Sequence, residues 1–142
     1  MINLPFAVVI SGIIAPIALP SGSQLNENFA GEIAVASGFG QTLQGVVANQ
    51  PLSFTHLSVV PIDECVGMNP TFFSSSHVCT RDNTESGKNA CIGDSGGPLA
   101  ITRNNRPLLI GVFSFVFMPC DGNGPAGFSR VTSFMNWISQ HL

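Results

Sequence analysis

The stretch Cys91-Ile92-Gly93-Asp94-Ser95-Gly96-Gly97-Pro98-Leu99 places one serine among three glycines. Because glycine has no Cβ, this backbone can take turns that other residues would block. Such a turn exposes the hydroxyl of Ser95. It can also aim neighbouring backbone N–H groups at one point, as acyl transfer requires for its developing oxyanion. The alternative is a glycine-rich turn between strands that serves geometry only, but the length of the motif favours a catalytic turn.

The composition indicates one domain with unusually little charge. Charged residues make up 9% of the 142 residues, far below the usual quarter. Hydrophobic residues make up 44%, with Gly 15 and Pro 10, which is typical of a loop-rich folded chain rather than a disordered one. The net charge is −3 without a basic cluster, so we predict no nucleic-acid partner. The low charge indicates that a partner covers much of the surface or that the chain is part of a larger fold.

Four cysteines stand at positions 65, 79, 91 and 120, with no Cys-x-x-Cys pair. This spacing argues against zinc, and we predict no metal site and no cofactor. An even number of cysteines in a β-type chain rich in Gly and Pro predicts disulfides and a secreted, extracellular protein. Four cysteines allow three connectivities, and their spacing does not choose among them.

Residues 1–20 read MINLPFAVVISGIIAPIALP and are almost entirely apolar. No positive charge precedes the apolar run, and Pro5, Pro16 and Pro20 interrupt it, which argues against a signal peptide and against a transmembrane helix. We therefore expect no membrane association. We predict a strand over residues 4–10 followed by an extended linker, and keep a signal peptide as the alternative.

Alternating apolar residues and turn signals predict a mostly β fold with about six short strands. The expected strands cover residues 32–39, 52–60, 77–80, 98–102, 107–117 and 128–131. Such a chain suits a closed or nearly closed barrel. A hairpin turn is expected over residues 103–106.

Two helices are expected beside the strands. Asp63 is a candidate N-cap for a helical turn over residues 64–68, and Thr132 or Ser133 for a C-terminal helix. Helical spacing of apolar residues in this last segment predicts an aromatic face, including Trp137, packed onto the barrel as core.

The glycine-rich turn resembles the nucleophile signature of trypsin/chymotrypsin-type serine proteases. The resemblance extends over nearly the entire chain: residues 2–20 resemble the inter-barrel linker, Ser37-Gly38-Phe39-Gly40 a Gly-Trp-Gly turn, residues 110–115 the substrate-pairing strand, and Gly127-Phe128-Ser129-Arg130-Val131 with Trp137-Ile138 the closing strand and helix. The linker and tail look most like those of insect digestive or collagenase-like members. The implied fold is a C-terminal six-stranded antiparallel β-barrel plus C-terminal helix, with the first barrel largely missing. Residues 1–20 would form a remnant strand and linker, and residues 21–142 the second barrel.

The resemblance implies a role for each matching residue. Ser95 corresponds to the acylating nucleophile, and the backbone N–H groups of Gly93 and Ser95 to the oxyanion hole. Asp94 corresponds to the carboxylate that pairs with the freed amino terminus in active members. The segment Ser114, Phe115 and Val116 would bind the substrate backbone. The family pattern pairs Cys65 with Cys79 and Cys91 with Cys120.

The same resemblance predicts some of the residues that line the specificity pocket. Asn89 stands where trypsin-like members carry Asp, so no charge is available there to pair with Arg or Lys. Val116 and Ala126 stand where wide pockets carry glycine, and Ile92 adds an apolar rim. We therefore predict a preference for small or medium apolar side chains, elastase-like rather than chymotrypsin-like.

Two members of the family's catalytic triad have no match in this sequence. A serine hydroxyl is a poor nucleophile without an adjacent base. The family's His lies in an Ala-Ala-His-Cys motif and its Asp precedes the linker, and neither motif occurs here. We expect structural or surface roles for His56, His77 and His141. Asp63, Asp82 and Asp121 do not match the missing Asp.

These observations leave two functions from different classes. The first is a serine endopeptidase acting through an acyl-enzyme on Ser95, truncated and inactive or nearly so alone. Its partners would be protein or peptide substrates, and the missing first barrel or another protein on an exposed apolar face. The alternative is a non-catalytic protease-like binding module. An esterase of another fold is disfavoured, because no helix pattern follows the serine turn.

Overall fold

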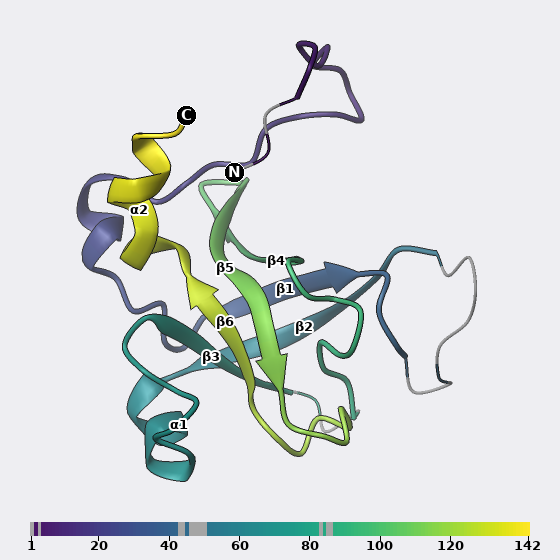
Figure 1. The fold of residues 1–142 in the computed structure, drawn as a ribbon, viewed down its shortest axis with the longest axis vertical. Helices are drawn as coiled ribbons and strands as arrows, with labels where there is room; N and C mark the ends of the chain where they lie inside the picture. Colours follow the sequence, from purple (N-terminus) through teal and green to yellow (C-terminus); the bar gives the residue numbers. More distant parts are fainter. Residues whose placement is uncertain (1, 3, 43–44, 46–50, 83, 85–86) are drawn as a thin grey trace.

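Six antiparallel strands close into a barrel in the order β1-β2-β3-β6-β5-β4 (Figure 1). The computed structural model describes residues 2, 4–42, 45, 51–82, 84 and 87–142. The strands are β1 (Ile33–Gly38), β2 (Ser53–Val60), β3 (His77–Asp82), β4 (Pro98–Arg103), β5 (Arg106–Val116) and β6 (Ala126–Arg130). The helices are η1 (Gly22–Asn26), α1 (Ile62–Met68) and α2 (Val131–Ser139). The mostly β class, the six-stranded antiparallel barrel and the C-terminal helix are thus confirmed.

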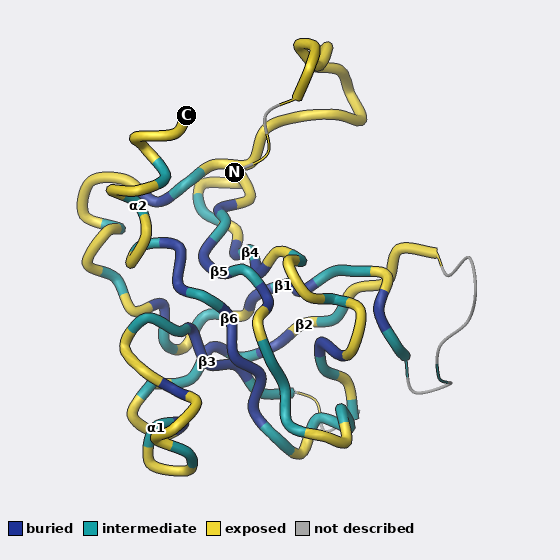
Figure 2. Tube along the Cα trace, in the orientation of Figure 1, coloured by how far each residue is buried: buried dark blue, intermediate teal, exposed yellow. Residues whose placement is uncertain are grey.

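The core lies inside this barrel, where alternate residues of each strand point inward. Ala34 of β1 pairs with Leu57 of β2, and large side chains such as Ile110 and Phe128 fill much of the interior. Small residues on one strand opposite large ones on another allow a dense interior. Figure 2 shows the buried positions concentrated along the strands, with exposed residues in the connecting loops.

The hairpin predicted over residues 103–106 joins β4 and β5 through a two-residue turn, Asn104-Asn105. Arg103 pairs with Arg106, and Asn104 and Asn105 both have positive φ, 49° and 59°. These are the dihedrals of a type I′ turn, which asparagine tolerates and whose twist matches the strands.

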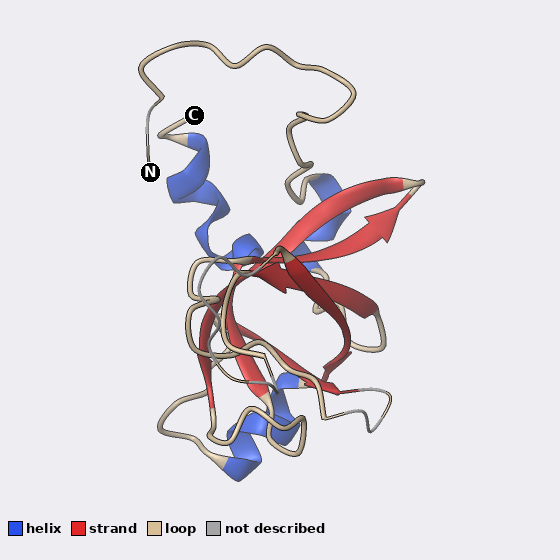
Figure 3. Ribbon diagram, turned by 90° about the vertical axis from the view of Figure 1, so that its right-hand side faces the viewer, coloured by secondary structure: helices blue, strands red, loops and turns tan. Residues whose placement is uncertain are grey.

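The predicted strand over residues 4–10 is wrong. These residues form an exposed loop that extends away from the barrel in two perpendicular views (Figures 1 and 3). Phe6 is 83% exposed and Val9 82%, since no strand of the described chain lies beside them. The segment first meets the barrel near its end, where Ala18 bridges to Leu108. Met1 and Asn3, part of the predicted linker, lie outside the described residues.

The helix starts also differ from those predicted. Pro61 holds the N-cap of α1, and Asp63 lies in its first turn. Strand β6 runs directly into α2, with Arg130 at the N-cap, so Thr132 and Ser133 are already helical. The Arg130 side chain is nearly buried and donates to the carbonyls of Asn28 (3.4 Å), Ser75 (3.0 Å) and His77 (2.7 Å). Burial lowers the pKa of Arg130.

Trp137 is not a core residue as predicted. It is 48% exposed and stacks on His141, with ring centroids 4.4 Å apart. Phe134 on the same helix is 45% exposed. Helix α2 therefore presents an apolar face to solvent. Among the described residues, the helices are all too short or too polar to cross a bilayer.

Candidate active site

The serine turn, residues 91–97, is held by backbone hydrogen bonds at both ends. Asp94 N–H donates to the Cys91 carbonyl (3.0 Å), and Gly97 N–H to the Asp94 carbonyl (2.8 Å). Gly96 and Gly97 in turn pair with Phe113 of β5. Gly93 and Gly96 have φ of +96° and +84°, which L-residues rarely adopt. Ser95 is consequently exposed at the tip of a well-fixed turn.

A contact from outside the turn orients the peptide bond before Gly93. The N–H of Gln41 donates to the Ile92 carbonyl at 2.7 Å. Because carbonyl and N–H point in opposite directions across a trans peptide, the N–H of Gly93 points away from Gln41. Within the described residues, the N–H groups of Gly93 and Ser95 have no hydrogen-bond partner, and both residues are exposed. Two backbone donors are therefore available beside the serine hydroxyl.

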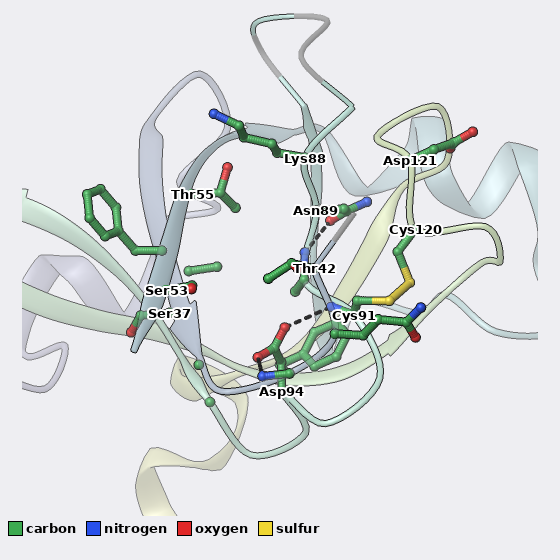
Figure 4. Close-up of a pocket in the computed structure, with 18 of the residues that line it drawn as sticks. Ser37, Thr42, Ser53, Thr55, Lys88, Asn89, Cys91, Asp94, Cys120 and Asp121 are labelled. Atoms are coloured by element: carbon green, nitrogen blue, oxygen red, sulfur yellow. Dashed lines mark hydrogen bonds between the residues drawn. A yellow bond between two sulfur atoms is a disulfide. The ribbon is translucent and has the colours of Figure 1, made fainter. Parts of the chain in front are cut away.

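The carboxylate of Asp94 points to the opposite side of the turn, into the protein. Its Oδ1 accepts from Gly40 N–H (2.7 Å) and its Oδ2 from Cys91 N–H (2.9 Å), as Figure 4 shows from the cavity side. A Cβ at Gly40 would lie only 2.6 Å from Oδ1, and one at Gly38 would overlap the same atom. Residues 38–40 were predicted as a turn, but not as the cradle of this carboxylate.

A cavity of about 410 Å³ opens beside Asp94. Ser53, Thr55 and Lys88 line it together with Asp94 and the disulfide at Cys91, whereas Ser95 does not (Figure 4). This cavity therefore belongs to the carboxylate side of the turn. Within the described part of the chain, no cluster of His, Cys, Asp and Glu could hold a metal ion.

Two disulfides fix the surroundings of the turn. Cys91 is bonded to Cys120, which ties the turn to the loop between β5 and β6, and Cys65 is bonded to Cys79, which ties α1 to β3. These are the pairs that the family pattern implied.

The predicted specificity residues lie in two places: Val116 and Ala126 on the β5–β6 pair, and Asn89 and Ile92 just before and within the serine turn. Val116 lies opposite Ala126 in the ladder, and Ala126 is fully buried. The Asn89 side chain donates to the Gly124 carbonyl (3.0 Å) and accepts from Ala90 N–H (2.9 Å). Ile92 is 59% exposed at the rim of the turn. Of these four residues, only Asn89 lines the cavity beside Asp94.

Next to the turn, one edge of β5 is unpaired. Strand β4 pairs with β5 as far as Val112, and the serine turn forms the next backbone hydrogen bonds, at Phe113. A register shift between Phe113 and Phe115 leaves Ser114 as an extra, exposed residue. Residues 114–116 thus have no strand on this side among the described residues. Such an edge can accept an extended peptide.

The three histidines occupy other places. His56 on β2 meets the ring of Phe54 edge-on, and His141 Nδ1 lies 2.7 Å from the Trp137 carbonyl. His77 Nδ1 accepts from Ser74 N–H (3.1 Å), and burial together with the nearby charge of Arg130 lowers the pKa of His77. No hydrogen bond joins any of them to Ser95 in the part of the chain that the structure describes.

Three residues that shape the site were missed from sequence. Gln41 acts through its backbone N–H, which any residue could supply. Gly40 also acts through its backbone, in a place that any glycine could take. The only signal was the Gly-x-Gly pattern at residues 38–40. Gly127 was noted only as part of the closing strand, although the ring of Phe115 lies directly against it.

Comparison with known proteins gives one consistent family. The family model described as Trypsin matches residues 1–138. A collagenase of Hypoderma lineatum is 43% identical over 130 residues, covering 90% of this chain and 47% of the relative. Serine protease 1 of Drosophila melanogaster is 35% identical over 127 residues, covering 89% and 46%.

A solved structure of HL collagenase superimposes with a TM-score of 0.82 at 41% identity, covering 94% of this chain and 56% of that chain. The likeness therefore extends to the three-dimensional fold. The chain spans about half the length of the curated relatives it matches.

Proposed function

Because this chain belongs to the trypsin family, we propose that it carries the nucleophile half of a serine endopeptidase, with Ser95 as the attacking residue. The observation that supports this most directly is the exposed Ser95 beside two unpaired N–H donors. In this proposal residues 1–20 are the inter-barrel linker and residues 21–142 the second barrel. The family implies peptide substrates.

The proposed acylation step uses these groups in order. Ser95 Oγ forms a bond to the peptide carbonyl carbon while the carbonyl oxygen becomes an oxyanion bound by the N–H groups of Gly93 and Ser95. The hydroxyl proton passes to a base and then to the leaving amine as the C–N bond breaks. Since no described histidine reaches Ser95, we propose that this base comes from a first barrel, and that the chain alone is inactive.

A fluorophosphonate probe tests the nucleophile. We expect Ser95 to be labelled when the chain is complexed with the amino-terminal half of the Hypoderma lineatum collagenase, to be labelled far more slowly alone, and never in Ser95→Ala. Equal labelling of the isolated chain would contradict the proposed inactivity. Absence of labelling in a stable complex would contradict the assignment of Ser95.

The proposed substrate preference is for small or medium apolar side chains. The Asn89 amide is neutral and already bonded to Gly124, which supports a pocket without a carboxylate at this position to pair with Arg or Lys. The side chain of Val116 beside Ala126 supports a preference for smaller side chains. Peptide anilides ending in Ala, Leu, Phe or Arg, offered to the reconstituted complex, test this preference. We expect Ala or Leu to be cleaved fastest, and fastest cleavage after Arg would overturn the preference.

A second candidate is a binding module without catalysis. The open edge of β5 favours it, because that edge can hold a peptide whether or not Ser95 reacts. The two disulfides support an extracellular location for either function. The exposed apolar segment around Phe6 and Val9 supports a partner that covers it, which we propose to be the first barrel.

A further inference from the structure

We propose that Gly127 is a positioning residue: it lets the ring of Phe115 lie against the backbone of β6 and so sets the depth of an apolar subsite beside the open edge of β5. This inference rests on the proposed function, because it concerns the same peptide-binding edge. The ligand is an extended peptide with one large apolar side chain placed over Phe115.

The contact between Gly127 and Phe115 is direct. The two residues are paired in the β5–β6 ladder, and the ring of Phe115 bends over its partner. A Cβ on Gly127 would lie 2.6 Å from Phe115 Cε1 and 2.8 Å from Cε2, well inside van der Waals contact. Gly127 has no positive φ, so its backbone would accept alanine. The three atoms nearest to such a Cβ all belong to the ring of Phe115.

Other rings surround Phe115 and limit how it can respond. Its centroid lies 5.0 Å from that of Phe73, 5.4 Å from His77, 5.9 Å from Phe72 and 6.1 Å from Phe117. Phe73 is buried and fixed in the small core beside α1. A Cβ on Gly127 would therefore lift the ring of Phe115 away from the sheet rather than tilt it sideways.

The position of the ring matters for a bound peptide. Phe115 is half-buried and belongs to the unpaired stretch 114–116, so its remaining surface lies beside any strand added there. Phe72 is 53% exposed and flanks it. In this proposal an apolar side chain of the peptide lies over the lowered ring, and a raised ring would occupy that place. Aromatic contacts of this kind contribute roughly 0.5–1.5 kcal/mol beyond area burial, about two- to tenfold in affinity.

Peptide titration of the full 142-residue chain tests the proposal. The probes are acetylated tetrapeptide amides of alanine, each with one phenylalanine placed in turn, measured by calorimetry or NMR. We expect one position of phenylalanine to bind several-fold tighter than the all-alanine peptide. Gly127→Ala should abolish this gain without changing the affinity of the all-alanine peptide. Gly67→Ala, where a Cβ meets no atom within 4 Å, should change neither.

A second variant separates positioning from general damage. In Phe115→Ala the ring is gone, so adding Gly127→Ala should have no further effect on peptide selectivity. The α-protons of Gly127 should show an upfield ring-current shift that Phe115→Ala removes. The role of Gly127 would be overturned if Gly127→Ala weakened the binding of every peptide equally. It would also be overturned if Gly127→Ala had an undiminished effect in the Phe115→Ala background. Failure of every peptide to bind wild type, with the ring-current shift present, would overturn the peptide edge itself and the proposed function with it.

Discussion

The serine turn and the amino-terminal segment match the same family model, yet the structure treats them in opposite ways. The turn is bonded to β5, to Gln41 and to Gly40, and its disulfide reaches the loop after β5. The segment before Pro16 has almost only internal bonds, such as Ser11 N–H to the Ile14 carbonyl, and exposes Phe6 and Ile13. The turn therefore finds its partners within the described chain, whereas the segment does not.

Leucine truncation in the two regions gives the largest contrast. Leu99 lies two residues after the turn and is fully buried, while Leu4 is 64% exposed. We expect Leu99→Ala to lower the free energy of unfolding by about 2–5 kcal/mol through a lost core side chain and a cavity. Leu4→Ala should change it by less than about 0.5 kcal/mol. Urea denaturation of both variants measures the difference, and similar losses of unfolding free energy would show that the two regions are packed alike.

Removing the disulfide of the turn comes next in size. Cys91 and Cys120 are separated by 29 positions, and loop entropy predicts a loss of about 3–4 kcal/mol for Cys91→Ala with Cys120→Ala. In this double variant we also expect faster hydrogen exchange within residues 91–97 than in the strands. Exchange by mass spectrometry checks this, and unchanged exchange in residues 91–97 would show that the backbone bonds suffice.

A glycine pair probes close approach in the two regions. A Cβ at Gly40 would lie 2.8 Å from the backbone nitrogen of Asp94, whereas one at Gly12 meets no atom within 4 Å. We expect Gly40→Ala to cost about 1–3 kcal/mol by overpacking. Gly12→Ala should be neutral or slightly stabilising. Thermal melts of both variants decide, and a destabilising Gly12→Ala would indicate that the segment is packed.

The smallest expected effect is a pH dependence away from both regions. Burial lowers the pKa of His77 below its unfolded value near 6.5. The unfolded chain therefore binds more protons, and stability is full above about pH 6.5 and falls as the pH drops toward the folded pKa. Melting temperatures between pH 7 and 5 should fall less in His77→Asn than in wild type. Equal falls would assign the pH dependence to other groups.

The strands could be predicted because their signal is local. Alternation of apolar and polar residues in β1 and β2 records which side chains face the barrel, and the structure places these strands within one residue of the expected bounds. The segment over residues 4–10 has the same apolar character, but a strand also needs a neighbour to pair with. The prediction that Trp137 is a core residue was wrong for a similar reason, since helical spacing identifies an apolar face and not what covers it.

For the candidate site, the sequence carries a signal only where the chemistry requires a particular side chain, and the roles predicted from it stay predictions. Ser95, Asp94 and Asn89 were identified by type and position in a motif. Gln41 acts through its backbone N–H, so its side chain gave no signal. The role of Gly127 depends on a ladder partner twelve positions earlier in the chain, Phe115, and on the register that joins them. Such pairings become visible only when the strands are placed side by side.

The extra residue at Ser114 has a consequence for pairing between molecules at the open edge of β5. An open strand edge is a template on which identical molecules can pair and aggregate. Here the unpaired stretch is interrupted by a bulge, which strengthens the local twist and prevents a long flat register. A short bound peptide can pair with the few free backbone groups of β5. The strand edge of another molecule would lose its register at the bulge. The same irregularity that presents the edge therefore keeps it from propagating into a shared sheet.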